Sequence, residues 1–137
     1  MSDMFSVFGV SGSALDVYKT WIDAVSDNVA NADNTSPTSG PAFQARYIVA
    51  QAVPGGPDNT GAGVQVAGVN YGPAGGVEIY DPSDPQADSK GMVRKPDIDM
   101  GEQMTALIIA QRGYEANLAV VSRAQSAYQA ALSIGNA

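Results

Sequence analysis

The chain has no cysteine and no histidine among its 137 residues. Without cysteine, disulfide bonds and thiolate metal sites are excluded, and the composition fits a reducing or an oxidising compartment equally well. Without histidine, the most common general base and the usual zinc ligands are missing too. We therefore expect no cofactor and no enzyme, because no convergent acid, base and nucleophile can be assembled.

Basic residues are also scarce, with 7 Lys and Arg against 14 Asp and Glu and a formal net charge of −7. Nucleic-acid binding needs clustered positive charge. The nearest cluster, Lys90, Arg94 and Lys95, has aspartates beside it, which favours a solvated loop. The sequence therefore predicts no nucleic-acid partner.

Long apolar runs are missing as well. The first ten residues lack a basic start and a long apolar stretch, so they predict no cleaved secretory signal. No run approaches the roughly 20 apolar residues of a membrane span. Aromatic residues make up only 7% of the chain, which argues against a large close-packed core. If the chain leaves the cytoplasm, we expect it to use a route without a cleaved signal.

The chain has instead one apolar heptad stripe near each end. Residues recur at a 3–4 spacing, which is typical of helices that pack lengthwise on partners. The first stripe is Leu15, Tyr18, Ile22, Val25, Val29 and Ala32, and the second is Met100, Met104, Leu107, Gln111, Tyr114, Leu118, Val121, Gln125, Tyr128 and Leu132.

Capping signals predict where the two helices begin and end. The first is expected to start with Ser11 or Ser13 as N-cap and to end near residues 32–33. The second is expected to run from residues 97–99 to about Ile134, with Gly135 as its C′ residue. It carries a further face of small residues, namely Gly113, Ala116, Val120, Ala124, Ala127 and Ala131. A helix that is apolar on more than one face needs more than one partner, which implies other subunits.

The segment between the stripes holds all eight prolines and most of the glycines. Period-two patterns predict strands at 43–53, 63–69 and 77–80, with a hairpin tip or loop at 54–61. The predicted fold is α+β, with N- and C-terminal helices paired as a coiled-coil-like hairpin around a small glycine- and proline-rich β segment. Residues 1–33 and 98–137 would form the terminal helical domain, and residues 34–97 the middle segment.

Three motifs, in order along the chain, resemble those of the bacterial flagellar basal-body rod proteins. Residues 26–35 (SDNVANADNT) resemble the N-terminal signature of flagellar rod and hook proteins. Residues 77–99 (VEIYDPSDPQAD, GMV and PDID) are similar to a block of the proximal rod proteins, and EQM at 102–104 with RGYEAN at 112–117 is similar to their C-terminal helix. The resemblance runs from about residue 14 to residue 135.

The resemblance implies a structural subunit that is exported unfolded through the flagellum's own apparatus, without a cleaved signal, for flagellum-dependent motility. Such subunits polymerise through their terminal helices into the rod, the drive shaft that crosses the periplasm and cell wall around an export channel. The implied partners are copies of the chain, other flagellar rod proteins and the proteins of the rod base and export gate. No direct membrane span is implied.

The predicted subunit interface combines stripe residues with polar residues of the motifs. Asn28, Asn31 and Asn117 could bind neighbouring subunits or fix helix register, although Asn is also common at ordinary helix ends. The full set is Leu15, Ile22, Val25, Asn28, Val29, Asn31, Met104, Leu107, Arg112, Tyr114, Asn117, Leu118, Val121, Tyr128 and Leu132. Trp21 lies off the stripe and fits either the core or an intersubunit contact.

Two other functions remain as alternatives. A small secreted helical-hairpin module could bind a partner through its stripe, but that class has Trp-x-Gly at a helix turn, whereas Ile22 and Asp23 follow Trp21 here. A module that binds carbohydrate or peptidoglycan would depend on residues 36–96 alone. Binding of that segment to cell-wall sacculi would distinguish the second alternative.

Overall fold

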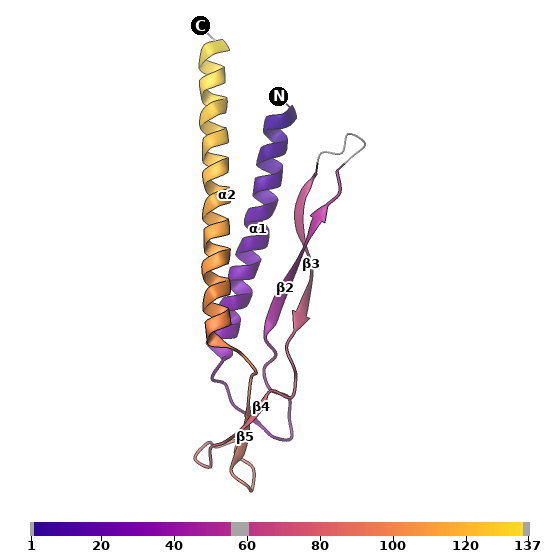
Figure 1. Cartoon of the computed structure of the whole chain (residues 1–137), viewed down its shortest axis with the longest axis vertical. Helices are drawn as coiled ribbons and strands as arrows, with labels where there is room; N and C mark the ends of the chain where they lie inside the picture. Colours follow the sequence, from indigo (N-terminus) through magenta and orange to yellow (C-terminus); the bar gives the residue numbers. More distant parts are fainter. Residues whose placement is uncertain (1, 56–60, 136–137) are drawn as a thin grey trace.

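The computed structural model describes residues 2–55 and 61–135. Its elements are α1 (Ser2–Asn31), β1 (Ser36–Pro37), β2 (Arg46–Val53), β3 (Gly63–Tyr71), β4 (Val77–Tyr80), β5 (Met92–Lys95) and α2 (Met100–Gly135). Figure 1 shows α1 and α2 side by side and antiparallel, with the β2–β3 hairpin along the other side of α1 and the remaining strands beyond the junction of the helices. The predicted α+β class is confirmed.

The first helix begins earlier than predicted. It starts at Ser2, so the prediction that Ser11 or Ser13 caps it was wrong. Both serines are used for packing inside the helix: Ser11 is buried, and the Ser13 hydroxyl donates to the Val10 carbonyl and accepts from the Val64 amide of β3. The second helix includes Gly135, which was predicted to lie just beyond it. Within the described residues, neither helix is long and apolar enough to cross a membrane.

The middle segment forms two antiparallel sheets. One is the β2–β3 hairpin, with Arg46 opposite Tyr71 and a register shift between Val49 and Ala50; its predicted tip lies mostly in residues 56–60, outside the described residues. The other has the order β1-β5-β4. The three predicted strands are present, β4 with the predicted bounds and β2 and β3 with shifted ones. The strands β1 and β5 were missed, because β1 has only two residues and β5 carries two cations.

The strand β5 corrects the prediction of a solvated loop around Lys90, Arg94 and Lys95. Arg94 and Lys95 lie in the central strand of the second sheet, next to Val93, which is fully buried. Arg94 pairs with Glu78 on β4 at 3.3 Å, and Lys95 pairs with Asp33 after α1 at 3.2 Å. Opposite charges on neighbouring chain segments therefore tie this sheet together and connect it to the end of α1.

Candidate subunit-interface surface

The two helices pack in a constant antiparallel register. Asn28 of α1 bonds to Gln103 of α2, and the ring of Tyr18 lies against Gly113. Ten residues separate Asn28 from Tyr18, and ten separate Gln103 from Gly113. Each residue along α1 is therefore matched by one residue along α2, so any residue of one helix can be assigned its level on the other.

A buried polar cluster joins three elements near the junction of the helices. The Asn28 side chain is fully buried; its Nδ2 donates to the Arg46 carbonyl of β2 at 2.9 Å and to Gln103 Oε1 of α2 at 3.0 Å. Its Oδ1 accepts the Arg46 amide at 2.8 Å. One amide side chain thus forms hydrogen bonds to the main chain of β2 and to the buried Gln103. A carboxylate could not donate these bonds, and an apolar residue could neither donate nor accept them.

The aromatic residues of α1 pack against the small-residue part of α2. Tyr18 and Trp21 stack, with ring centroids 6.2 Å apart and an interplanar angle of 17°. The Tyr18 ring occupies the space where a side chain at position 113 would begin, so Gly113 is needed for this contact. Trp21, which the sequence left between two roles, is half-buried within the chain.

We expect Gly113→Ala to destabilise the fold although alanine is the better helix former. The propensity gain is about 1 kcal/mol, but the new methyl group overlaps the Tyr18 ring, and such overpacking costs about 1–3 kcal/mol. The matched control is Gly12→Ala, where no atom lies within 4 Å of the added carbon. Urea unfolding should show a lower midpoint for Gly113→Ala and an unchanged or higher one for Gly12→Ala. Equal stabilisation of both would contradict the Tyr18 contact.

The interface residues predicted on α1 mostly face the interior of the chain. Val25 and Asn28 are buried, and the others are half-buried. Asn31 Nδ2 bonds to the Asp27 carbonyl one turn earlier, so its amide supports the helix end. The half-buried residues are Leu15, Ile22, Val29 and Asn31.

The interface residues predicted on α2 divide into two groups. Leu107, Tyr114, Asn117, Val121 and Tyr128 are half-buried on the side that meets α1. The others, Met104, Arg112, Leu118 and Leu132, are exposed. Met104 and Leu118 are exposed because α1 covers only one edge of the heptad stripe. Leu132 is exposed because, in this register, it lies beyond the level at which α1 begins.

Two exposed apolar stripes border the face of α2 that contacts α1. Helical periodicity puts Met100, Met104, Ile108 and Leu118 on one side and Ile109, Val120 and Ile134 on the other. Every residue from Gln129 to Gly135 is exposed as well. Ile108, Ile109 and Ile134 belong to neither face predicted from the sequence, and only a count of all apolar positions around the helix would have included them. Exposed apolar surface of this extent marks a site of protein association.

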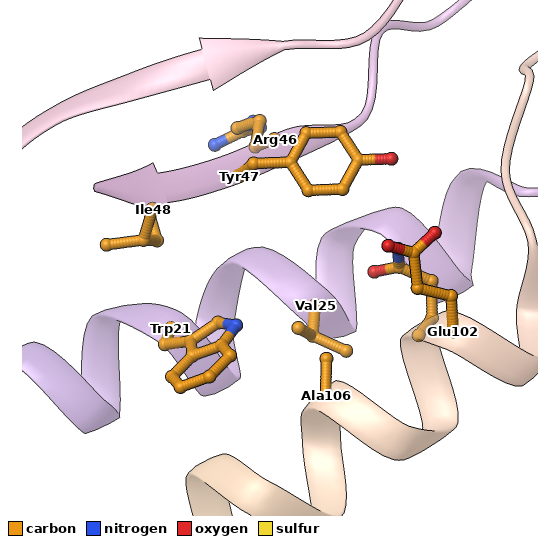
Figure 2. A pocket seen from close by; sticks show the side chains of 8 residues that line it. Trp21, Val25, Arg46, Tyr47, Ile48, Glu102 and Ala106 are labelled. Atoms are coloured by element: carbon orange, nitrogen blue, oxygen red, sulfur yellow. The ribbon is translucent and has the colours of Figure 1, made fainter. Parts of the chain in front are cut away.

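A pocket of about 170 Å³ lies where α1, β2 and α2 meet. Figure 2 shows Trp21 and Val25 from α1, Tyr47 and Ile48 from β2, and Glu102 and Ala106 from α2 around it. Partial burial, together with the charges of Glu102 and Asp97, raises the pKa of the Tyr47 hydroxyl, so that group is neutral at physiological pH. The titratable side chains of the lining are those of Arg46, Tyr47 and Glu102.

The aspartates of the 77–99 motif build turns. Asp88 Oδ1 accepts the amides of Lys90 and Met92, and its Oδ2 accepts the Thr38 hydroxyl. These bonds, led by that from Met92, lower the pKa of Asp88 below its ordinary value of 3.8. Asp81 in the same way accepts the amide and hydroxyl of Ser83. In the part of the chain that the structure describes, no three acidic side chains are grouped as a metal site.

Comparison with known proteins gives the family. The C-terminal family of flagellar basal body rod FlgEFG proteins matches residues 89–134. The flagellar basal-body rod protein FlgC of Yersinia enterocolitica is 33% identical over 132 residues, covering 96% of this chain and 98% of the relative. The chain belongs to the FlgC family of flagellar basal-body rod proteins. FlgC of Borreliella burgdorferi is 33% identical and that of Bacillus subtilis 30% identical, each over 96% of this chain and 97% of the relative.

Membership of the FlgC family makes the chain a structural component of the flagellar basal-body rod. The rod assignment made from the three motifs is confirmed. The secreted helical-hairpin module, which was the alternative, is not favoured by these relatives.

Proposed function

We propose that the chain is a subunit of the proximal rod that polymerises through α1 and α2 into the drive shaft around an export channel. The observation that carries this proposal is the similarity to FlgC rod proteins over nearly the whole chain. The exposed apolar stripes of α2 supply the surface that such a polymer would bury. On this view residues 1–33 and 98–137 form the inner tubular domain, residues 34–97 pack outside it, and the helix pair continues as a coiled-coil-like hairpin. Residues 1, 56–60, 136 and 137 of that division lie outside the described residues.

The interface residues take different parts in this proposal. Met104, Leu118 and Leu132 would contact neighbouring subunits directly, because 40–50% of each residue is exposed. Buried Val25 and Asn28 would act indirectly, by holding α1, α2 and β2 in the shape that neighbours bind. Arg112 is exposed as well, and the remaining predicted residues are half-buried and would be covered at the rim of a contact. No cofactor and no catalytic role are part of the proposal.

The partners we propose are copies of the chain, other rod proteins and the proteins of the rod base and export gate. The location is the flagellar basal body, in the rod across the periplasm and cell wall. Export would take place through the flagellar apparatus without a cleaved signal. We propose no nucleic-acid partner, because the formal net charge of the chain is −7.

Deleting the gene and imaging basal bodies by electron cryotomography tests the proposal. We expect the rod and filament to be lost above an intact membrane ring, and the wild-type gene to restore both. Before the deletion, a search of the genome should exclude a second gene that encodes a protein with the same function. A complete flagellum in the deletion strain would overturn the rod role.

A further inference from the structure

The side of α2 that faces away from α1 carries two arginines without partners. Arg112 and Arg123 are eleven residues apart, or three turns, so they lie in line along the helix. Both are exposed, and within the described residues neither guanidinium makes an ion pair or a hydrogen bond. They form an arginine ridge between the two exposed apolar stripes, with the exposed Glu115 one turn from Arg112.

The outer side of α1, which is turned away from α2 and lies beside the β2–β3 hairpin, carries the opposite charge, and Asp16 lines the groove between α1 and β3. Asp16 and Asp23 lie seven residues apart on one exposed face, and Asp16 has no ion-pair partner among the described residues. Asp23 pairs with Lys19 at 3.0 Å, but both groups are well exposed, and such a pair contributes little. On the same face Gly9 and Gly12 have open space where a side chain would start, so another helix can approach closely.

The register of α1 and α2 shows how these two faces could meet. Counting from Tyr18 opposite Gly113, Arg112 is level with Lys19, and Arg123 is level with Phe8. Two copies side by side at the same height would therefore place Arg112 of one copy beside the positively charged Lys19 of the other. A neighbour displaced by about 9 Å, or six residues, toward the end where α1 begins brings each aspartate within about 3 Å of the level of one arginine. Arginine side chains are long enough to bridge that difference.

We propose that the arginine ridge of α2 docks on the outer face of α1 in a second, axially displaced copy of this chain, with Arg112 beside Asp23 and Arg123 beside Asp16. The inference rests on the proposed function and deepens it. The two surfaces are different, so the contact is heterologous, and the displacement makes it open-ended. Contacts of that kind generate helical polymers and not closed dimers.

Charge reversal tests the pairing in the deletion strain. Arg123→Glu and Asp16→Arg should each reduce intact basal bodies per cell at least tenfold, and the double variant should restore at least half of them. Lys90→Glu is the matched control, because it makes the same charge change outside both helices and should leave assembly unchanged. Normal numbers of basal bodies in either single variant would overturn the pairing. So would a double variant with no more basal bodies per cell than the single variants. Failure of the wild-type gene to restore flagella would instead count against the proposed function.

Cross-linking identifies the occupant, because the natural chain contains no cysteine. Lys19→Cys and Ala119→Cys put one thiol on each proposed surface. Co-expressed in one strain and oxidised in purified basal bodies, the two variants should form a disulfide-linked dimer, whereas each variant alone should stay monomeric. Absence of the mixed dimer in assembled rods would mean that a different polypeptide covers the ridge, and would overturn the assignment of a second copy.

Discussion

A Leu118→Asp substitution is expected to abolish rod assembly while leaving the chain folded. Leu118 is 50% exposed on one of the apolar stripes of α2, so a carboxylate there remains solvated in the free subunit. In the polymer the same carboxylate would be buried against a neighbour without a partner, at a cost of several kcal/mol in every contact. Swimming in soft agar should be lost, with no rods in purified basal bodies.

Val77→Asp is the matched control for this result. Val77 has a similar exposure, 46%, but lies on β4, away from both helices. Circular dichroism of the two purified variants should match that of the natural chain. Normal motility of the Leu118→Asp strain would show that this stripe faces solvent in the rod as well.

An Asn28→Ala substitution is expected to give the largest loss of stability of any single side chain described here. It removes the three hydrogen bonds that join α1, β2 and α2, leaves the buried Gln103 Oε1 without this donor, and removes two bonds from the part-buried main chain of Arg46. Together these losses should lower the free energy of unfolding by about 3 kcal/mol. Urea denaturation of the purified chain measures this as a shift of the midpoint at constant slope.

Asn31→Ala controls for the general effect of removing an asparagine amide from α1. Asn31 makes only local bonds at the helix end: its Nδ2 donates to the Asp27 carbonyl, and its Oδ1 accepts from Asn34 Nδ2. Its loss should lower the unfolding free energy by less than about 1 kcal/mol. If both variants lost the same amount, the connection from α1 to β2 and α2 would not carry the stability that its geometry indicates.

The heptad spacing predicted the long second helix and its pairing with α1, but only half of the residues that make the contact. Leu107, Tyr114, Val121 and Tyr128 do lie toward α1, whereas Met104 and Leu118 from the same stripe point outward. A stripe that is apolar over a wide arc does not specify which edge the partner covers. That choice depends on the opposing surface, where the Tyr18 ring fits only over Gly113.

The start of α1 shows how tertiary contacts outweigh local signals. Gly9, Gly12 and the nearby serines favour a helix start near residue 11, since glycine disfavours helix interiors and serine caps helices. The helix begins at Ser2 instead, and Ser13, inside it, accepts a hydrogen bond from the Val64 amide of β3. Ser13 and Val64 are 51 residues apart, so no short window of the sequence around the helix start contains both partners.

The buried asparagine illustrates the same limit at the candidate site. The resemblance to rod proteins singled out Asn28, but it could not say that the residue faces inward. Its partners come from Arg46, 18 residues later, and from Gln103, 75 residues later. A polar residue inside an amphipathic helix has the same sequence signature whether it binds a neighbour or a buried amide. Only the position of β2 against α1 decides between the two.

The distance along the chain between Asn28 and Gln103 has a consequence for the timing of folding. During synthesis α1 leaves the ribosome long before α2 exists, so the inner side of α1 has no long-helix partner until residues beyond 100 have been made. The β2–β3 hairpin can form in the meantime, but the three-way bond of Asn28 cannot. The last helix made therefore completes the fold. If another protein bound α2 first, the contacts of α1 and Asn28 with α2 would not form, and the chain would remain incompletely folded.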